Sequence, residues 1–257
     1  MKRILGTVCM SFVLGGHLYG VEITSPEEAV NIAGKQRMYT QRMLKDYAMV
    51  GMKNTFGNPA EDLQQTVSEF DDHLKSLKSY AKSPETKASL EEVQKLWNPI
   101  KTALQETPTV EKAASLQESL EGLLKASDTT TKHFAKESGK TTGEIVNIAG
   151  RQRMLSQRMA SLYMLKVWGM EDPKFKAKLD DAMKLFKESL QKLESSPLND
   201  DEIKGLLAKV KRSFTFFEMM NRSGSKKFIP TLIYKKSNDI LKNMDSVTKL
   251  YVQKETK

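Results

Sequence analysis

The sequence predicts an all-α protein made of two tandem antiparallel four-helix bundles. Three observations support this fold class. Helix-forming residues (Ala, Leu, Lys, Glu, Gln and Met) dominate, and strand signals are nearly absent. A motif of thirteen residues occurs twice, with ten identical positions, at 31–43 and at 147–159. Caps and prolines divide each copy into four segments of helical length.

Composition limits the classes of protein to consider. The chain has 257 residues, 41 Lys and Arg against 32 Asp and Glu, and a net charge of +9. Its mean hydropathy of −0.49 is that of a globular, charge-rich protein with room for one or two domains. The single cysteine excludes an intrachain disulfide and any CxxC metal or redox site.

Residues 1–20 read as a secretory signal peptide. Lys2 and Arg3 precede a short apolar run, and a small residue, Gly20, comes before polar sequence. We place cleavage after Gly20; an uncleaved anchor is the alternative, although the apolar run is short for a membrane span. The mature chain would lack cysteine, carry 39 − 32 = +7, and reside free in the periplasm without an output domain of its own.

The remaining chain divides into a first four-helix domain at 21–140 and a second at 141–257. Self-similarity at an offset of 147 − 31 = 116 residues indicates two copies of a domain, not a short-repeat solenoid. Short connections favour antiparallel neighbours. The junction at 138–143 is either a hinge or part of one continuous helical rod. The expected helices are 26–56, 59–81, 85–105, 109–138, 142–170, 173–195, 199–221 and 226–254.

Helix punctuation supports these bounds. Ser25 to Glu28 is a capping box with proline at the first helical position, and Asn58 starts a similar pattern. Pro99 is expected to kink the third helix or to end it early, and Pro230 to shift the start of the last.

The repeated motif carries a polar stripe beside its apolar face. On a helical wheel, Gly34, Arg37 and Gln41 align at i, i+3 and i+7, next to the face that packs into the bundle. The second copy repeats this stripe with Gly150, Arg153 and Gln157. Glycine inside a helix costs about 0.5–1 kcal/mol relative to alanine, so its repetition indicates close approach of another backbone or a ligand.

Arginine supplies planar, permanently charged donors that match a small planar oxyanion. Two arginines brought face to face repel each other unless an anion lies between them. Two motif copies meeting on a twofold or pseudo-twofold axis would therefore form an anion clamp. The alternative is that the glycines permit close helix packing and the arginines form surface salt bridges; the duplication favours ligand binding.

Both copies of the motif resemble a known family. The segments 33–42 and 149–158 fit the pattern Ala-Gly-x-x-Arg-Met-x-x-x-Arg. This pattern is similar to that in the sensor domains of type IV pili methyl-accepting chemotaxis transducers and of nitrate- and nitrite-responsive sensor histidine kinases. The resemblance implies a periplasmic four-helix bundle whose first helix carries the motif. The family domain is usually single and fused to a membrane-spanning chain, whereas here two copies lie in tandem.

The resemblance also implies a binding site. In the nitrate sensors the ligand lies between the first helices of two subunits, held by the first arginine of the motif and by backbone near the glycine. The implied contact residues here are Gly34, Arg37, Gly150 and Arg153. Residues that would lie nearby and add charge or polar groups are Lys35, Gln41, Arg42, Arg151, Gln157 and Arg158. We favour one intramolecular site formed by the two copies; a homodimer in which each copy pairs with its equivalent is the alternative.

Other kinds of site are weakly indicated. His73 and His133 are isolated, so we expect no zinc site, no other metal and no cofactor. The fourteen methionines suit Cu(I) in principle, but their helical spacing indicates core packing. No convincing acid, base or nucleophile indicates an enzyme, and export argues against nucleic acid as a partner despite the positive charge.

Two hypotheses of function follow. The first is a soluble periplasmic receptor for nitrate or nitrite that signals through a membrane-bound sensor kinase or chemoreceptor. The second is a helical interaction module without a small ligand, which pairs with a membrane sensor or a pilus-chemotaxis component.

Overall fold

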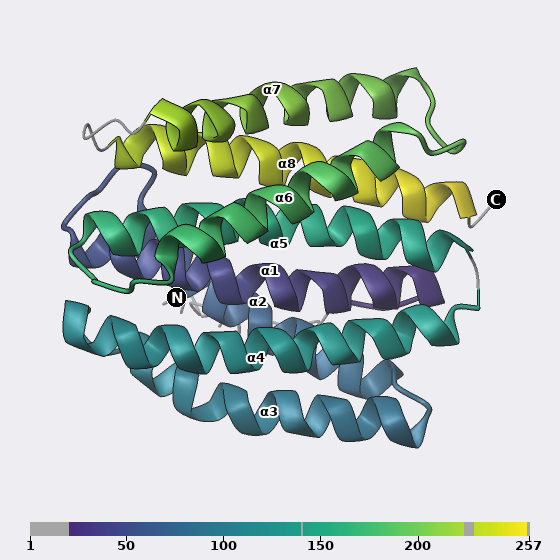
Figure 1. Cartoon of the computed structure of the whole chain (residues 1–257). Coiled ribbons are helices and arrows are strands. Elements are labelled where there is room, and N and C mark those ends of the chain that lie inside the picture. The colour runs from purple at the N-terminus through teal and green to yellow at the C-terminus, as the bar shows by residue number, and fades with distance from the viewer. Residues whose placement is uncertain (1–20, 140, 224–228, 256–257) are drawn as a thin grey trace, which may run out of the picture.

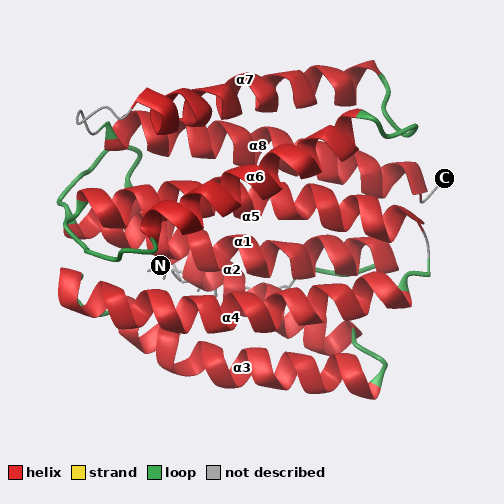
Figure 2. Cartoon of the chain, in the orientation of Figure 1, coloured by secondary structure: helices red, strands yellow, loops and turns green. Residues whose placement is uncertain are grey.

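The computed structural model describes residues 21–139, 141–223 and 229–255, and all regular structure within them is helical (Figure 2). This confirms the predicted all-α class. The predicted signal peptide, residues 1–20, lies outside the described residues. The helices are α1 (Pro26–Gly51), α2 (Pro59–Tyr80), α3 (Pro84–Leu104), α4 (Val110–Glu137), α5 (Thr141–Val167), α6 (Phe175–Glu194), α7 (Asp201–Ser223) and α8 (Pro230–Glu255).

Most helix ends lie within a few residues of the predicted ones, and α1 is the exception. Ser25 caps its start by accepting a hydrogen bond from the backbone N–H of Glu28 at 3.1 Å, as the capping box predicts. The helix ends at Gly51 instead of residue 56. The segment that follows contains positive φ angles at Lys53 (56°) and Asn58 (54°), which an α-helix cannot accommodate.

One of the two alternatives for Pro99, an early helix end, and the predicted Asn58 cap are wrong, while a kink at Pro99 stays a prediction. Pro99 lies inside α3, which continues to Leu104, so this proline does not end the helix. Asn58 makes no side-chain cap to the α2 backbone; its amide bonds the side chain of Glu61 instead. Pro230 is the first residue of α8, as its fixed φ allows.

Helices α1–α4 pack against one another and so do α5–α8, with each helix antiparallel to the next, and the buried apolar residues of both halves form one cluster (Figure 1). Close aromatic pairs, one tilted and one stacked, mark equivalent places in the two halves. Phe70 lies 4.2 Å from Trp97 between ring centroids, and Phe186 lies 4.4 Å from Phe214. The offset of 186 − 70 = 116 residues equals the motif repeat and that of 214 − 97 = 117 differs from it by one, so the two halves share a similar arrangement.

Helices α1 and α5 form the interface between the two halves and run parallel, side by side (Figure 1). Gly34 faces Gly150 near one end of the pair, and Gly51 faces Trp168 near the other. The Gly34–Gly150 contact thus joins equivalent positions of the two copies. This packing buries α1 on almost every side, including Gln36, Arg37 and Gln41, so the expected division into one apolar and one polar face does not describe its environment.

The junction between the halves is not one helical rod. Helix α4 ends at Glu137, Gly139 adopts a left-handed φ of 64°, and α5 begins at Thr141. Of the two alternatives left open by the sequence, the continuous helix is wrong.

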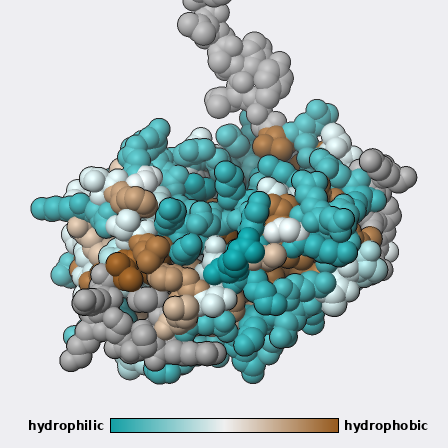
Figure 3. Space-filling view, turned by 90° about the horizontal axis from the view of Figure 1, so that it is seen from above, coloured by the Kyte–Doolittle hydropathy of each residue, from teal (hydrophilic) through white to brown (hydrophobic). Residues whose placement is uncertain are grey.

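The surface over α7 is mainly hydrophilic, with separate apolar patches (Figure 3). The most exposed large apolar side chain among the described residues is Met219, at 62%. Within the described residues, every helix is too short or too polar to cross a bilayer.

Candidate functional site

The paired arginines of the motif meet at the α1–α5 interface. Arg37 and Arg153 are fully buried. A methyl group placed on Gly34 would lie 3.5 Å from Nη2 of Arg153 and 3.9 Å from the Cα of Gly150. A methyl group on Gly150 would lie 3.4 Å from Nη2 of Arg37. The two glycines thus let each guanidinium group reach the opposite helix, and the structure brings all four predicted contact residues together.

Each guanidinium group is held by one contact within its own half and one across the interface. Nη1 of Arg37 donates to Oδ1 of Asp128 in α4 at 2.7 Å, and Nη2 donates to the backbone carbonyl of Asn147 in α5 at 3.3 Å. The ion pair is short, whereas the carbonyl contact is at the long end of the N–H···O range.

The second copy repeats this pattern. Nη1 of Arg153 donates to Oδ1 of Asp245 in α8 at 2.8 Å, and Nη2 donates to the carbonyl of Asn31 in α1 at 3.2 Å. The two arginines therefore cross between the halves in opposite directions.

The site contains positively charged arginines and lysines and two negatively charged carboxylates, Asp128 and Asp245. Burial lowers the pKa of Arg37 to about 10, although Asp128 opposes this change, so the guanidinium stays charged at neutral pH. Burial alone would raise the pKa of Asp128, but Arg37 and Lys132 lower it below its usual value. Lys132 holds the other oxygen of Asp128 at 2.7 Å. Each carboxylate thus has two cationic partners.

The second half has the same arrangement. Burial opposes ionisation of Asp245, but Arg153 and Lys35 lower its pKa, and Lys249 holds its second oxygen at 2.9 Å. Burial lowers the pKa of Arg153, with Asp245 opposing. Asp128 and Asp245 were missed in the sequence, although a signal exists: Asp128 with Lys132 and Asp245 with Lys249 repeat an i, i+4 pair at an offset of 117 residues.

Several buried polar atoms around the arginines have no hydrogen-bond partner among the described residues. They include Nε of Arg37 and of Arg153 and the side-chain oxygens of Asn31 and Asn147. Unpartnered buried polar atoms are rare in folded proteins and cost free energy. Among the described residues, each guanidinium group therefore keeps one unused donor, and each half also has one unused asparagine acceptor.

Lys35 and Arg151, predicted to add positive potential, lie at this site. Burial lowers the pKa of Lys35, and the nearby Asp245 carboxylate opposes the change. Arg151 is close enough to Arg37 to contribute to the lowering of its pKa. Both residues are partly exposed, whereas Arg37 and Arg153 are buried.

Arg42 and Arg158 are directed to other partners. Nη2 of Arg42 donates to Asp62 in α2 at 2.6 Å, and Nη1 of Arg158 donates to Glu121 in α4 at 2.5 Å. These arginines hold neighbouring helices together and do not join the Arg37–Arg153 group.

The glutamines of the motif are buried between the halves. Oε1 of Gln41 accepts a hydrogen bond from Ser161 at 3.3 Å, and Nε2 of Gln157 donates to the carbonyl of Ser237 at 3.1 Å. Their contacts contribute to packing of α1, α5 and α8 rather than to the arginine site.

Residues considered for metals lie in the core. Met43, Met49, Met159 and Met164 are fully buried. His73 is buried against the ring of Tyr39, and burial lowers its pKa to about 3. No group of three potential metal ligands is found in the part of the chain that the structure describes.

A family model matches residues 24–129 and 135–214, two segments that each contain one copy of the motif. Its description is the N-terminal region of type IV pili methyl-accepting chemotaxis transducers. The chain belongs to this family. The family's N-terminal domains are sensory, are typically periplasmic and act within membrane signalling systems. No curated protein matches the chain, and no solved structure does.

Proposed function

We propose that this member of the transducer family is a periplasmic receptor for a small planar anion, nitrate or nitrite, bound between Arg37 and Arg153. Gly34 and Gly150 would provide the close approach of α1 and α5 at the site. A membrane-bound sensor kinase or chemoreceptor would read the resulting change in the α1–α5 interface.

The observation that carries this proposal is the convergence of two buried guanidinium groups with unused donors. Each has a free Nε, and each Nη2 makes only a long carbonyl contact of 3.2–3.3 Å. A planar anion would accept short, charge-assisted bonds from such donors. Lys35 and Arg151 add positive charge, so the local cations outnumber Asp128 and Asp245.

The two aspartates define what binding would involve. Asp128 and Asp245 act as internal counter-ions of the arginines. The second oxygen of each carboxylate also forms an ion pair with a lysine. A guest anion would take over part of the guanidinium hydrogen bonding. Because α1 and α5 are in contact at the glycines, its entry would shift the two helices relative to each other. A ligand that favours the shifted arrangement moves the population toward it.

The same ion pairs support a second candidate function. Arginines already matched by carboxylates of their own halves suit a helical interaction module without a small ligand. In that case the Arg–Asp pairs would only fasten the two halves, and the chain would act by pairing with a membrane sensor or a pilus-chemotaxis component.

Calorimetry with sodium nitrate and sodium nitrite separates the two functions, with sodium chloride as a spherical-anion control. The receptor proposal expects saturable binding to the wild type and its loss in Arg37→Lys/Arg153→Lys, which keeps the charge but not the planar fork. Arg42→Lys/Arg158→Lys is the matched control, because those arginines lie outside the site, and it should bind normally. Absence of binding to folded wild-type protein would refute the receptor and leave the interaction module.

A further inference from the structure

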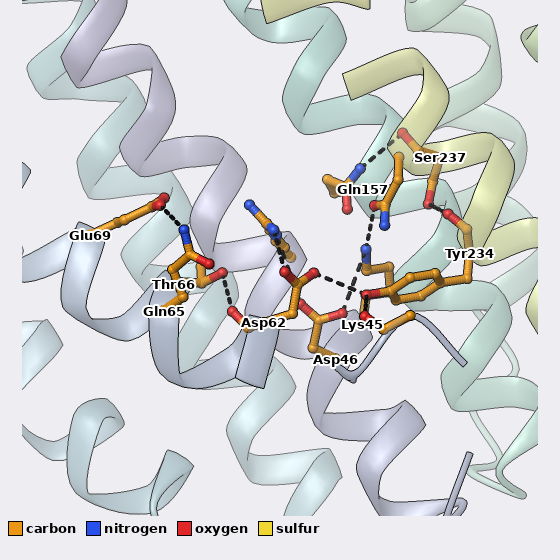
Figure 4. A network of polar contacts seen from close by, with 12 residues as sticks. Lys45, Asp46, Asp62, Gln65, Thr66, Glu69, Gln157, Tyr234 and Ser237 are labelled. Carbon is orange, nitrogen blue, oxygen red and sulfur yellow. Dashed lines mark hydrogen bonds and ion pairs between the residues drawn. The ribbon is translucent and has the colours of Figure 1, made fainter. Parts of the chain in front are cut away.

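A second buried polar cluster lies on α1, nine residues beyond Arg37 or about 13 Å along the helix. It contains two consecutive ionisable residues, Lys45 and Asp46, both fully buried (Figure 4). We call these two residues and their neighbours the Lys45 cluster. Its other members are Arg42, Asp62, Gln157, Tyr234 and Asn238.

The Lys45 cluster ties α8 of the second half to α1 and α2 of the first. Nζ of Lys45 donates to Oδ1 of Asn238 at 2.7 Å and lies 4.1 Å from the ring centroid of Tyr234. The Tyr234 hydroxyl in turn donates to Oδ2 of Asp62 at 2.9 Å. These contacts form a latch across the interface, on the side of α1 that faces α8 (Figure 4).

The latch breaks the internal symmetry of the molecule. At an offset of 116 residues, Ser161 and Leu162 occupy the positions of Lys45 and Asp46. Helix α5 therefore packs at the corresponding positions without a buried lysine or a buried carboxylate. The pair on α1 therefore requires an explanation beyond the general packing of the two halves.

Asp46 is poorly compensated as an anion. Neither of its carboxylate oxygens has a hydrogen-bond partner among the described residues, and its two ion-pair contacts are long, with Nζ of Lys45 at 3.5 Å and Nε of Arg42 at 3.9 Å. Burial raises the pKa of Asp46 to about 7, Lys45 opposes this change, and Asp62 adds to it. Burial also lowers the pKa of Lys45.

Among the described residues, the cations that act most strongly on Asp46 are Lys45 and Arg42, both on its own helix. Helix α2 contributes the carboxylate of Asp62, which Arg42 already holds at 2.6 Å, and α8 contributes the hydroxyl of Tyr234. On helix α5, uncharged Gln157 donates to the carbonyl of Ser237, and Arg158 is paired with Glu121 of α4. A proton is therefore the ligand that best relieves the buried charge of Asp46.

We infer that Asp46 is a proton-binding site and that its protonation keeps the latch between the two halves closed. When Asp46 is neutral, it does not compete for the Lys45 ammonium group, which donates to Asn238 and lies over the ring of Tyr234. When Asp46 loses its proton, the charged carboxylate is stabilised by any opening that admits water. Alkaline conditions therefore favour an open latch and acidic conditions a closed one. This inference does not depend on anion binding at Arg37 and Arg153.

Amide hydrogen exchange of the first three turns of α8 tests the latch, with rates corrected for intrinsic chemistry. For a closed-state pKa near 7 and an open-state pKa near the usual aspartate value, the opening constant should rise about tenfold between pH 6 and pH 8. Helix α3, which lies away from α8, should show no such change. Equal protection of α8 at both pH values in the wild type would overturn the inference.

Two variants isolate Asp46 as the group responsible. Asp46→Asn mimics the protonated side chain and should keep α8 protected at both pH values. Lys45→Ser/Asp46→Leu installs the residues of the second copy and should remove the pH dependence by removing the titrating group. A pH dependence that persists in either folded variant would assign the effect to another group and refute the proposal. The wild-type measurement decides the matter even if a variant fails to fold.

Discussion

The two partners of the Arg37–Asp128 ion pair should differ in the cost of their removal. The Arg37 side chain is fully buried, whereas the Asp128 side chain is 28% exposed and keeps Lys132 as a second partner. Asp128→Asn leaves a buried guanidinium without a carboxylate, for which we expect a loss of about 3–5 kcal/mol in unfolding free energy. Arg37→Met leaves a hydrated carboxylate already bonded to lysine and fills the interior with an apolar chain, so we expect a loss of only about 1–2 kcal/mol.

Urea unfolding followed by circular dichroism measures this difference. Arg153→Met and Asp245→Asn provide an internal replicate, because the Arg153 side chain is also fully buried and that of Asp245 is 26% exposed. If the methionine variants lose as much stability as the asparagine variants, the assignment of the desolvation cost to the guanidinium groups is wrong.

Nitrate extends the same experiment to function. Removal of the internal counter-ion in Asp128→Asn should strengthen binding of an external anion, and bound anion stabilises the folded state by RT ln(1 + [L]/Kd). We therefore expect nitrate to restore part of the lost stability of Asp128→Asn and to have a smaller effect on Arg37→Met. The wild type could bind nitrate while nitrate fails to stabilise Asp128→Asn. That result would show that Asp128 does not compete with nitrate.

Two further predictions concern other positions. A methyl group on Gly51 would lie 1.9 Å from Cζ2 of Trp168, so Gly51→Ala should cost about 1–3 kcal/mol in urea unfolding, while Gly122→Ala, with no atom within 4 Å, should gain about 0.5–1 kcal/mol. His73 has its folded-state pKa lowered to about 3, so the unfolded chain binds the proton more readily and stability falls as pH drops below about 6.5. By pH 5 this loss should reach about 2 kcal/mol relative to His73→Gln, and parallel stability profiles for the two proteins would contradict the burial argument.

Much of the architecture follows from local sequence. Caps and prolines locate the helices because they act within one turn, and the duplicated motif identifies the two halves because it is a direct comparison of residues. The same comparison predicts the meeting of Gly34 with Gly150, since a costly glycine at matching positions needs a close neighbour. These inferences use information contained within a few residues of each position.

The hydrogen-bond and ion-pair partners of the buried side chains depend on tertiary structure and are harder to predict from the sequence. The sequence does not state that Arg37 reaches Asp128, ninety-one residues away, or that its Nη2 crosses to the carbonyl of Asn147. The Lys45–Asp46 pair was also missed, because two consecutive charged residues normally indicate a solvent-exposed face. Burial of α1 on nearly all sides, through α2, α4, α5 and α8 together, is what makes this pair exceptional.

The location of α1 and α5 on a single polypeptide has a consequence for how the protein responds to its surroundings. Tethered partners meet at an effective concentration on the order of millimolar, so their pairing survives dilution that would separate a weak dimer of single domains. The number of molecules in the compartment then has no influence on whether the interface forms. The amino-acid sequences of the two halves can also diverge independently. The difference between Lys45 and Ser161 at corresponding positions is one example.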